Sequence, residues 1–383
     1  MSEPTLYFGW RVALLGFASL QLLTLAVAIA VQPANARANR VLGLFLLVLV
    51  GVITPYTIGF AGAYDAWRWL TFAPFAIPLA LPPLLFAYTH ALVRGHRPAR
   101  PGLHLALPLA QFGYFLVCFA LPLEAKWNWY TGAHNRFVNP AFDLALLVSL
   151  AAYAAASLRL LGAYRRDLAE ARSDEDRFAT GWLSRVIVGL VAVLSIYAAF
   201  TVWDWLSGGI DYFQETGLYL ALVLIGGYLG VEGWRHAGLR FPVPAPPAVA
   251  EVAPTPDWTD LARRFDATLR ETGWTGEADL SLPVLARRLG TNTGRLSRAI
   301  NLGMGVNFSA WINGIRAETV ATALAAGATD DLLTLAFDAG FSSKASFNRA
   351  FQARFGCSPS RYRRGVPDHD FRDPEPKMRR VAG

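Results

Sequence analysis

Residues 332–356 read LLTLAFDAGFSSKASFNRAFQARFG. This stretch predicts two short helices with a tight turn at Gly340, because glycine readily adopts the backbone conformations that such turns need. Ser343 stands directly before the second helix, where a hydroxyl side chain is a favoured N-cap. Helical spacing predicts that the inward-facing side chains are Leu335, Ala336 and Phe337 on the first helix and Phe347, Ala350, Phe351 and Phe355 on the second. Two helices joined by a short turn that contains glycine are typical of a helix-turn-helix unit.

The same arrangement occurs earlier in the chain, where residues 280–301 read LSLPVLARRLGTNTGRLSRAIN. Here Gly290 makes the turn and Asn292 is well placed as the N-cap of the second helix. The residues expected to face inward are Leu285, Ala286, Leu289, Leu296, Ala299 and Ile300. Between the two units, Phe308 to Ala325 predicts a connecting helix with Trp311, Ile312, Ile315 and Leu324 on its apolar face. We therefore predict helix-turn-helix units at about 281–301 and 331–355, joined by a long helix.

From Leu280 to Arg364 the chain resembles the DNA-binding domain of AraC/XylS-type transcription regulators. Residues 336–364, AFDAGFSSKASFNRAFQARFGCSPSRYRR, are similar to the C-terminal signature of that family almost throughout. The resemblance implies a seven-helix domain in which a long helix joins two helix-turn-helix units. The first unit departs more from the family pattern, since Gly294 and Gly314 stand where larger residues are usual and Ile300 replaces a common aromatic residue.

The charge of this region agrees with DNA binding. Between Leu280 and Gly365 there are eleven basic residues and four acidic ones, a net charge of +7. A surface that binds phosphate groups needs such an excess of positive charge. The basic residues are Arg287, Arg288, Arg295, Arg298, Arg316, Lys344, Arg349, Arg354, Arg361, Arg363 and Arg364.

In each unit the second helix is expected to enter the major groove and to present the side chains that packing does not use. Arg298 and Arg349 are expected to contact guanine or phosphate, Asn348 to read adenine, and Arg295 and Lys344 to contact phosphate. The predicted DNA-binding residues are Thr293, Arg295, Ser297 and Arg298 in the first unit, and Lys344, Ala345, Ser346, Asn348 and Arg349 in the second. Two such helices on one connector would let a single chain read an asymmetric site in double-stranded promoter DNA.

The composition of the rest of the chain indicates a membrane protein. Hydrophobic residues make up 54%, charged residues only 16%, and the mean hydropathy is +0.32, which excludes a wholly soluble protein, a disordered chain and a coiled coil. We predict a seven-helix transmembrane bundle, with spans at 12–31, 41–60, 70–93, 103–123, 142–161, 183–206 and 217–234. The third span contains four prolines, among them Pro74 and Pro78, which predict that it is kinked or locally unwound.

Lys and Arg residues in the connections predict the orientation of the bundle. One alternating set of connections holds eleven of them and the other holds four. The basic set, which includes the connection between the fifth and sixth spans, is expected in the cytoplasm. The N-terminus is then outside and the C-terminal domain is cytoplasmic. Ala34-Asn35-Ala36 also resembles a signal-peptide cleavage site, but little positive charge precedes the first apolar run.

Residues 241–256, FPVPAPPAVAEVAPTP, contain six prolines and predict a semi-rigid polyproline spacer. The mixed charges and prolines of residues 366–383 predict a disordered tail. The predicted domains are therefore a sensor-like membrane domain at 1–240, the linker at 241–256, an all-α DNA-binding domain at 257–365, and the tail.

The function that we expect is that of a membrane-anchored one-component transcription regulator in the cell inner membrane. Its expected partners are promoter DNA, the lipid bilayer and an unidentified signal, and the paired sites usual in the family are compatible with a homodimer. The alternative is a transporter or channel with a fused DNA-binding domain. No phosphate loop, paired-histidine motif or nucleophile elbow occurs, so we expect no enzyme activity, no metal and no cofactor.

Overall fold

The computed structural model describes residues 6–207, 216–243 and 257–365. It divides into two compact units, Met1–Ala163 with Thr180–Val243, and Tyr164–Ala179 with Pro244–Gly383. The predicted spacer, from residue 244 onward, and the predicted tail lie outside the described residues. The predicted domain limits stay a prediction, and the units differ from them at Tyr164–Ala179, which clusters with the second unit. The regular structure of the described residues is helical, apart from one isolated bridge between Arg172 and Ser281.

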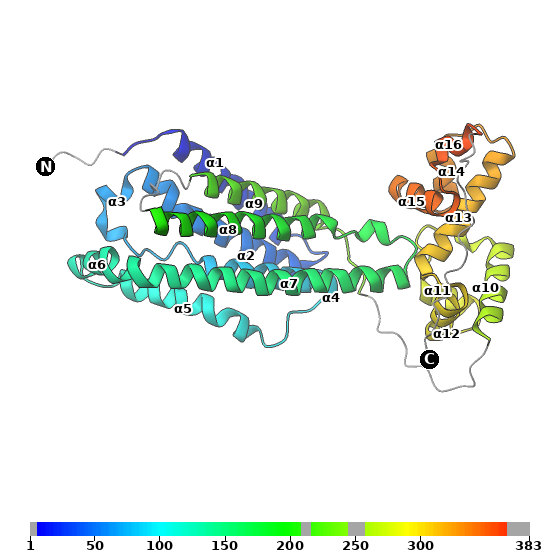
Figure 1. Ribbon diagram of the computed structural model, residues 1–383, viewed down its shortest axis with the longest axis horizontal. Coiled ribbons are helices and arrows are strands. Elements are labelled where there is room, and N and C mark those ends of the chain that lie inside the picture. Colours follow the sequence, from blue (N-terminus) through cyan, green and yellow to red (C-terminus); the bar gives the residue numbers. More distant parts are fainter. Residues whose placement is uncertain (1–5, 208–215, 244–256, 366–383) are drawn as a thin grey trace. The chain divides into compact units, whose positions relative to one another are not determined.

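Helices make up the first unit (Figure 1). Its elements are α1 (Trp10–Ala30), α2 (Ala36–Phe60), α3 (Ala63–Ala66), η1 (Arg68–Leu70), η2 (Pro78–Ala80), α4 (Leu81–Arg94), α5 (Pro101–Phe119), α6 (Leu123–Trp129), η3 (Tyr130–Val138), most of α7 (Asn139–Ala171), α8 (Gly181–Ser207) and α9 (Thr216–His236). In the part of the chain that the structure describes, six helical stretches are long and apolar enough to cross a bilayer. They are Trp10–Ala30, Ala36–Phe60, Pro101–Phe119, Leu123–Ala171, Glu175–Ala199 and Thr216–His236.

The third predicted span, 70–93, has a different structure. It begins in η1, passes through the short turn η2 and ends in α4, which has only 14 residues. Proline lies in the first turn of both η2 and α4. Because proline lacks an N–H donor, it begins a helix well but interrupts one that would otherwise pass through it. The predicted local unwinding of this segment is confirmed.

Close packing in the first unit depends on small residues of α9. This helix packs against α1, α2 and α8. A methyl group on Gly226 would lie 2.3 Å from a carbon of Leu49, and one on Gly233 would lie 2.3 Å from a carbon of Leu42. Both leucines belong to α2, so the glycines allow α9 to approach that helix closely.

The second unit contains the end of α7 and a sequence of short helices (Figure 1). They are η4 (Glu175–Phe178), α10 (Trp258–Thr272), η6 (Trp274–Gly276), α11 (Leu282–Arg288), α12 (Thr293–Arg298), η7 (Ala299–Met304), α13 (Phe308–Ala325), α14 (Leu332–Asp338), α15 (Lys344–Phe355) and α16 (Pro359–Arg363). The predicted connecting helix is α13, and its bounds agree with the prediction at both ends. Asn307 caps it and accepts a hydrogen bond from the amide of Ala310 at 2.8 Å.

Helix α13 takes part in two hydrophobic cores. Its first half, including Trp311 and Ile312, packs with α10, α11 and α12. Its second half, including Val320, packs with α14 and α15. Each helix-turn-helix unit thus has a core of its own, and the two cores share one rigid helix.

One predicted core residue is wrong. Phe337 was expected to face inward, but 49% of it is exposed. Its neighbour Ala336 is completely buried and Leu335 is half-buried. Successive residues of a helix point about 100° apart, so three consecutive side chains on the seven-residue α14 cannot all face one core.

Candidate nucleic-acid interface

The second helix-turn-helix unit consists of α14, a turn at Gly340 and α15. Gly340 has φ of +96°, a region that favours glycine, and an added methyl group would lie 2.5 Å from the carbonyl oxygen of Thr275. Ser343 is the N-cap of α15 and its hydroxyl accepts a hydrogen bond from the amide of Ser346 at 3.1 Å. The turn and the cap therefore determine where α15 begins.

One face of α15 is buried and the opposite face is exposed. Phe347 and Phe351 are 2% and 0% exposed and belong to the core shared with α13. Four of the five predicted DNA-binding side chains of this helix are exposed, namely Lys344, Ala345, Asn348 and Arg349. Ser346 is different, because it is only 6% exposed and its hydroxyl donates to the carbonyl oxygen of Ser343 at 2.8 Å. The structure therefore gives Ser346 a role in the cap.

The first helix-turn-helix unit consists of α11, a turn at Gly290 and α12. Gly290 has φ of +66°, and Asn292 accepts a hydrogen bond from the amide of Arg295 at 2.8 Å. Arg295 and Arg298 are exposed, whereas Thr293 and Ser297 are half-buried. Helix α12 has only six residues and continues into the π-helical turn η7. Its exposed surface is correspondingly shorter than that of α15.

Arg298 and Arg349 occupy equivalent positions in the two units. Each lies six residues after the N-cap of its helix, Asn292 or Ser343. Both are exposed. The structure thus presents one guanidinium group from the same turn of each recognition helix, which is suitable for contacts to base edges or phosphates.

Arg316 is not part of this exposed basic surface. It was counted in the basic excess of the domain, but it is 0% exposed and lies in α13 at the junction of the two cores. Its guanidinium donates hydrogen bonds to the carbonyl oxygens of Thr275 at 2.7 Å and Glu277 at 2.6 Å, and to the side chain of Asn313 at 2.9 Å. Burial lowers the pKa of Arg316 to about 10. This arginine therefore joins elements of the domain by buried hydrogen bonds.

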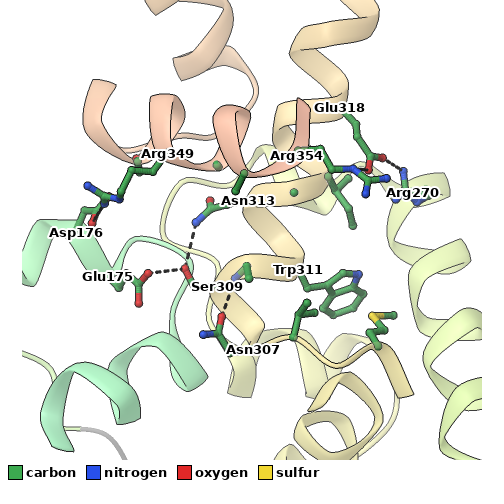
Figure 2. A pocket seen from close by; sticks show the side chains of 18 residues that line it. Glu175, Asp176, Arg270, Asn307, Ser309, Trp311, Asn313, Glu318, Arg349 and Arg354 are labelled. Carbon is green, nitrogen blue, oxygen red and sulfur yellow. Dashed lines mark hydrogen bonds and ion pairs between the residues drawn. The ribbon is translucent and has the colours of Figure 1, made fainter. Parts of the chain in front are cut away.

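An open hollow of about 520 Å³ lies beside α13 and α15 (Figure 2). On one side, Glu318 forms ion pairs with Arg354 of α15 and Arg270 of α10, both at 2.6 Å. On the other side it is lined by Glu175 and Asp176. Arg354 was also counted in the predicted basic surface, and its pairing with Glu318 reduces the positive charge that it offers to DNA.

The connection between α7 and α8 contacts both helix-turn-helix units, which was not predicted from the sequence. Figure 2 shows Asp176 beside Arg349, and the two form an ion pair. Glu170 also contacts the first helix-turn-helix unit. Its carboxylate accepts a hydrogen bond from Asn301 at 2.9 Å and lies 3.5 Å from the hydroxyl of Ser297. The signal in the sequence is the acidic run EARSDED at 170–176, but nothing local to it indicates contact with residues so distant along the chain.

The match to a known family agrees with this geometry. Residues 285–365 match a family described as a helix-turn-helix domain. Among solved structures, the chain is similar to the C-terminal domain of AraT, a response regulator from Geobacillus stearothermophilus. The two are 25% identical, and the match covers 33% of this chain and 97% of that chain with a TM-score of 0.25.

Proposed function

Since an AraC-type helix-turn-helix domain occupies residues 285–365, we propose that this transcription regulator is anchored in a membrane and binds promoter DNA from there. The domain family is one of DNA-binding regulators. The membrane helices would hold the cytoplasmic domain at the bilayer and perceive a signal that changes its binding to DNA. In this proposal the domain at 257–365 carries out recognition, and residues 1–240 form the anchor and sensor.

The observation that carries the proposal is the equivalence of Arg298 and Arg349. Two capped helices, held by one connecting helix, each present an exposed guanidinium group at the same distance from the cap. Arg349 and Asn348 would read base edges, because α15 rests on an aromatic core and presents a long exposed face. Arg298 would read bases or grip phosphate. Arg295, Lys344 and the half-buried Thr293 and Ser297 would add contacts that set the register of the domain on DNA.

Membrane anchoring is supported by the six long apolar helical stretches of the described residues. The alternating distribution of Lys and Arg is compatible with it and predicts a cytoplasmic DNA-binding domain. In this proposal the membrane helices themselves would detect the signal. A change in the membrane domain would then shift the DNA-binding domain between two populations of different DNA affinity.

The test is chromatin crosslinking and immunoprecipitation of the full-length protein, with Arg298→Ala and Arg349→Ala variants. Arg263→Ala is the matched control, since Arg263 is an exposed arginine on α10 rather than on a recognition helix. We expect sharp peaks for the wild type and the control, and loss of peaks for Arg349→Ala. Peaks of unchanged height in both recognition-helix variants would contradict the proposed surface.

Membrane anchoring has a separate test. After lysis, the full-length protein should stay in the membrane pellet when the pellet is washed at alkaline pH, because transmembrane helices resist extraction that removes peripheral proteins. A reporter fused at the C-terminus should be active only if it is of a kind that works in the cytoplasm. Recovery of the protein in the soluble fraction would refute the anchoring.

A further inference from the structure

The connection Tyr164–Ala179 is joined to the DNA-binding domain by main-chain hydrogen bonds. The amide and the hydroxyl of Ser173 both donate to the carbonyl oxygen of Leu280, at 3.2 and 2.9 Å. The carbonyl oxygen of Ser173 accepts from the side chain of Asn313 in α13 at 3.0 Å. Ser173 is only 2% exposed. Since buried backbone groups need partners, this pairing specifies one position of the connection on the domain.

A buried carboxylate of the connection lies near Arg316 of the domain. Asp174 is 2% exposed and accepts two hydrogen bonds from Arg172, at 2.6 and 2.9 Å. These bonds raise the pKa of Arg172. The carboxylate of Asp174 also opposes the lowering of the Arg316 pKa by burial. The connection thus supplies a negative charge near the buried guanidinium at the junction of the two cores.

Three carboxylates of the connection lie against elements that the DNA-binding domain uses. Glu170 contacts Asn301 and Ser297 in the first helix-turn-helix unit. Asp176 pairs with Arg349 in the second unit, and Glu175 accepts a hydrogen bond from Ser309 of α13 at 3.0 Å (Figure 2). Ser297 and Arg349 belong to the predicted DNA-binding residues.

Within the connection, the segment Glu170–Asp176 has a charge opposite to that of the domain. From Glu170 to Asp176 there are four acidic side chains and one arginine, a net charge of −3. DNA offers the same chemistry, a row of anionic oxygen atoms that accept hydrogen bonds from arginine and hydroxyl groups. The carboxylate of Asp176 pairs with the guanidinium group of Arg349, as a phosphate oxygen or a guanine acceptor would.

From these contacts we propose that the connection Tyr164–Ala179 competes with DNA for the two recognition helices and keeps the domain in a state of low DNA affinity. The inference rests on the proposed function, because it concerns regulation of the same surface. Glu170 lies on α7, which runs without a break from Asn139 to Ala171 and contains the predicted fifth span. Since α7 has residues in both units, a change in the membrane domain would in this proposal reach the connection along the chain through α7.

The experiment uses the full-length protein in lipid nanodiscs and a fluorescent DNA duplex of mixed sequence at low salt. The variants are Asp176→Asn, Glu170→Gln and the two together, with Arg349→Ala in parallel. Glu271→Gln is the matched control, because Glu271 is an exposed carboxylate on α10 and its loss changes the net charge equally. We expect each single variant to bind DNA about two- to fivefold more tightly than the control, and the double variant about tenfold more tightly.

A second measurement does not depend on any variant. In the wild-type protein, hydrogen exchange of the Ser173 amide reports the docked state, because this amide donates to Leu280. Addition of the duplex should speed that exchange if DNA displaces the connection. Tighter binding by the variants together with faster exchange supports the proposal.

The outcomes separate this inference from the proposed function. If Asp176→Asn and Glu170→Gln bind as the control does while Arg349→Ala binds weakly, the competition is refuted and the proposed function stands. Unchanged exchange at Ser173 when DNA is bound also refutes the competition. If Arg349→Ala binds like the wild type, the recognition surface itself is wrong, and the proposal fails together with it.

Discussion

The two helix-turn-helix units use the same local devices but differ in the packing behind their recognition helices. Both have a glycine with positive φ at the turn and a capping side chain before the second helix. Helix α15 then continues for 12 residues, and Phe351 contacts the rings of Phe347 and Phe355 at centroid distances of 5.6 and 4.7 Å. Helix α12 ends after six residues and passes into a π-helical turn.

Because of this difference, residues at equivalent positions of the two helix-turn-helix units need not have equivalent roles. A long helix on an aromatic core holds its exposed side chains in defined positions, which reading of bases requires. A short helix that changes its winding after two turns is better suited to contacts with phosphates, which tolerate small displacements. We therefore expect the second unit to provide most of the sequence specificity, and matched substitutions in the two units can test this.

The largest loss of stability is expected at Arg316, between the cores of the two helix-turn-helix units. Arg316→Met removes the donor to the buried carbonyl oxygens of Thr275 and Glu277. We expect a loss of about 3 kcal/mol in the free energy of unfolding of the domain, because buried acceptors are left without partners. Hydrogen exchange of the full-length protein should show that α11 and α15 lose protection together. Loss of protection in only one unit would show that α13 does not couple the cores. Arg263→Met, at an exposed arginine, is the control.

The two turn glycines should differ in their tolerance of alanine. At Gly340 the added methyl group would meet backbone atoms of Thr275 and Gly276 at 2.5 and 2.8 Å, whereas at Gly290 it meets nothing within 4 Å. Gly290→Ala has only the strain of positive φ, about 1 kcal/mol, and Gly340→Ala adds a steric clash, for about 3 kcal/mol in total. Local opening free energies of α12 and α15 from hydrogen exchange measure both. Equal effects would mean that the second turn can move away from Thr275.

Alanine at the two equivalent arginines should separate base reading from phosphate contact. Once a specific site has been found, Arg349→Ala should weaken binding to it about 10- to 100-fold and relax the preference at one base pair. Arg298→Ala should weaken binding to all sequences alike and lower the slope of log affinity against log salt concentration by about 1. Fluorescence anisotropy over a series of salt concentrations distinguishes the two. The reverse pattern would assign specificity to the first unit.

The smallest difference is expected at the caps. Asn292→Ala and Ser343→Ala each remove one hydrogen bond to an amide of the first turn, at 2.8 and 3.1 Å. Each should cost about 1 kcal/mol, with little difference between the units. Exchange rates of the Arg295 and Ser346 amides report the two losses directly. If the loss of stability in one helix-turn-helix unit is several times that in the other, the recognition helix of that unit forms only when its cap is present.

Local interactions account for most of the correct sequence predictions. Residues 308–325 form one helix with the predicted bounds, because a capping asparagine precedes it and apolar residues recur at helical spacing. Pro78, Pro82 and Pro83 break the third apolar segment, since the ring of proline removes a donor wherever it occurs. The inward direction of Phe337 was wrong, because spacing alone does not show which side of a short helix meets its core.

The helices, turns and caps of the DNA-binding domain and the apolar helical stretches before it can be predicted from the sequence, because they depend on residues within a few positions of one another. The burial of Arg316 and the pairing of Arg354 with Glu318 follow from the folded arrangement alone. The same is true of the contacts that Glu170 and Asp176 make with the helix-turn-helix units. Charge can be counted along a chain, but whether a charge faces solvent, a carbonyl oxygen or an opposite charge depends on contacts between residues tens to more than a hundred positions apart, and no local pattern records them.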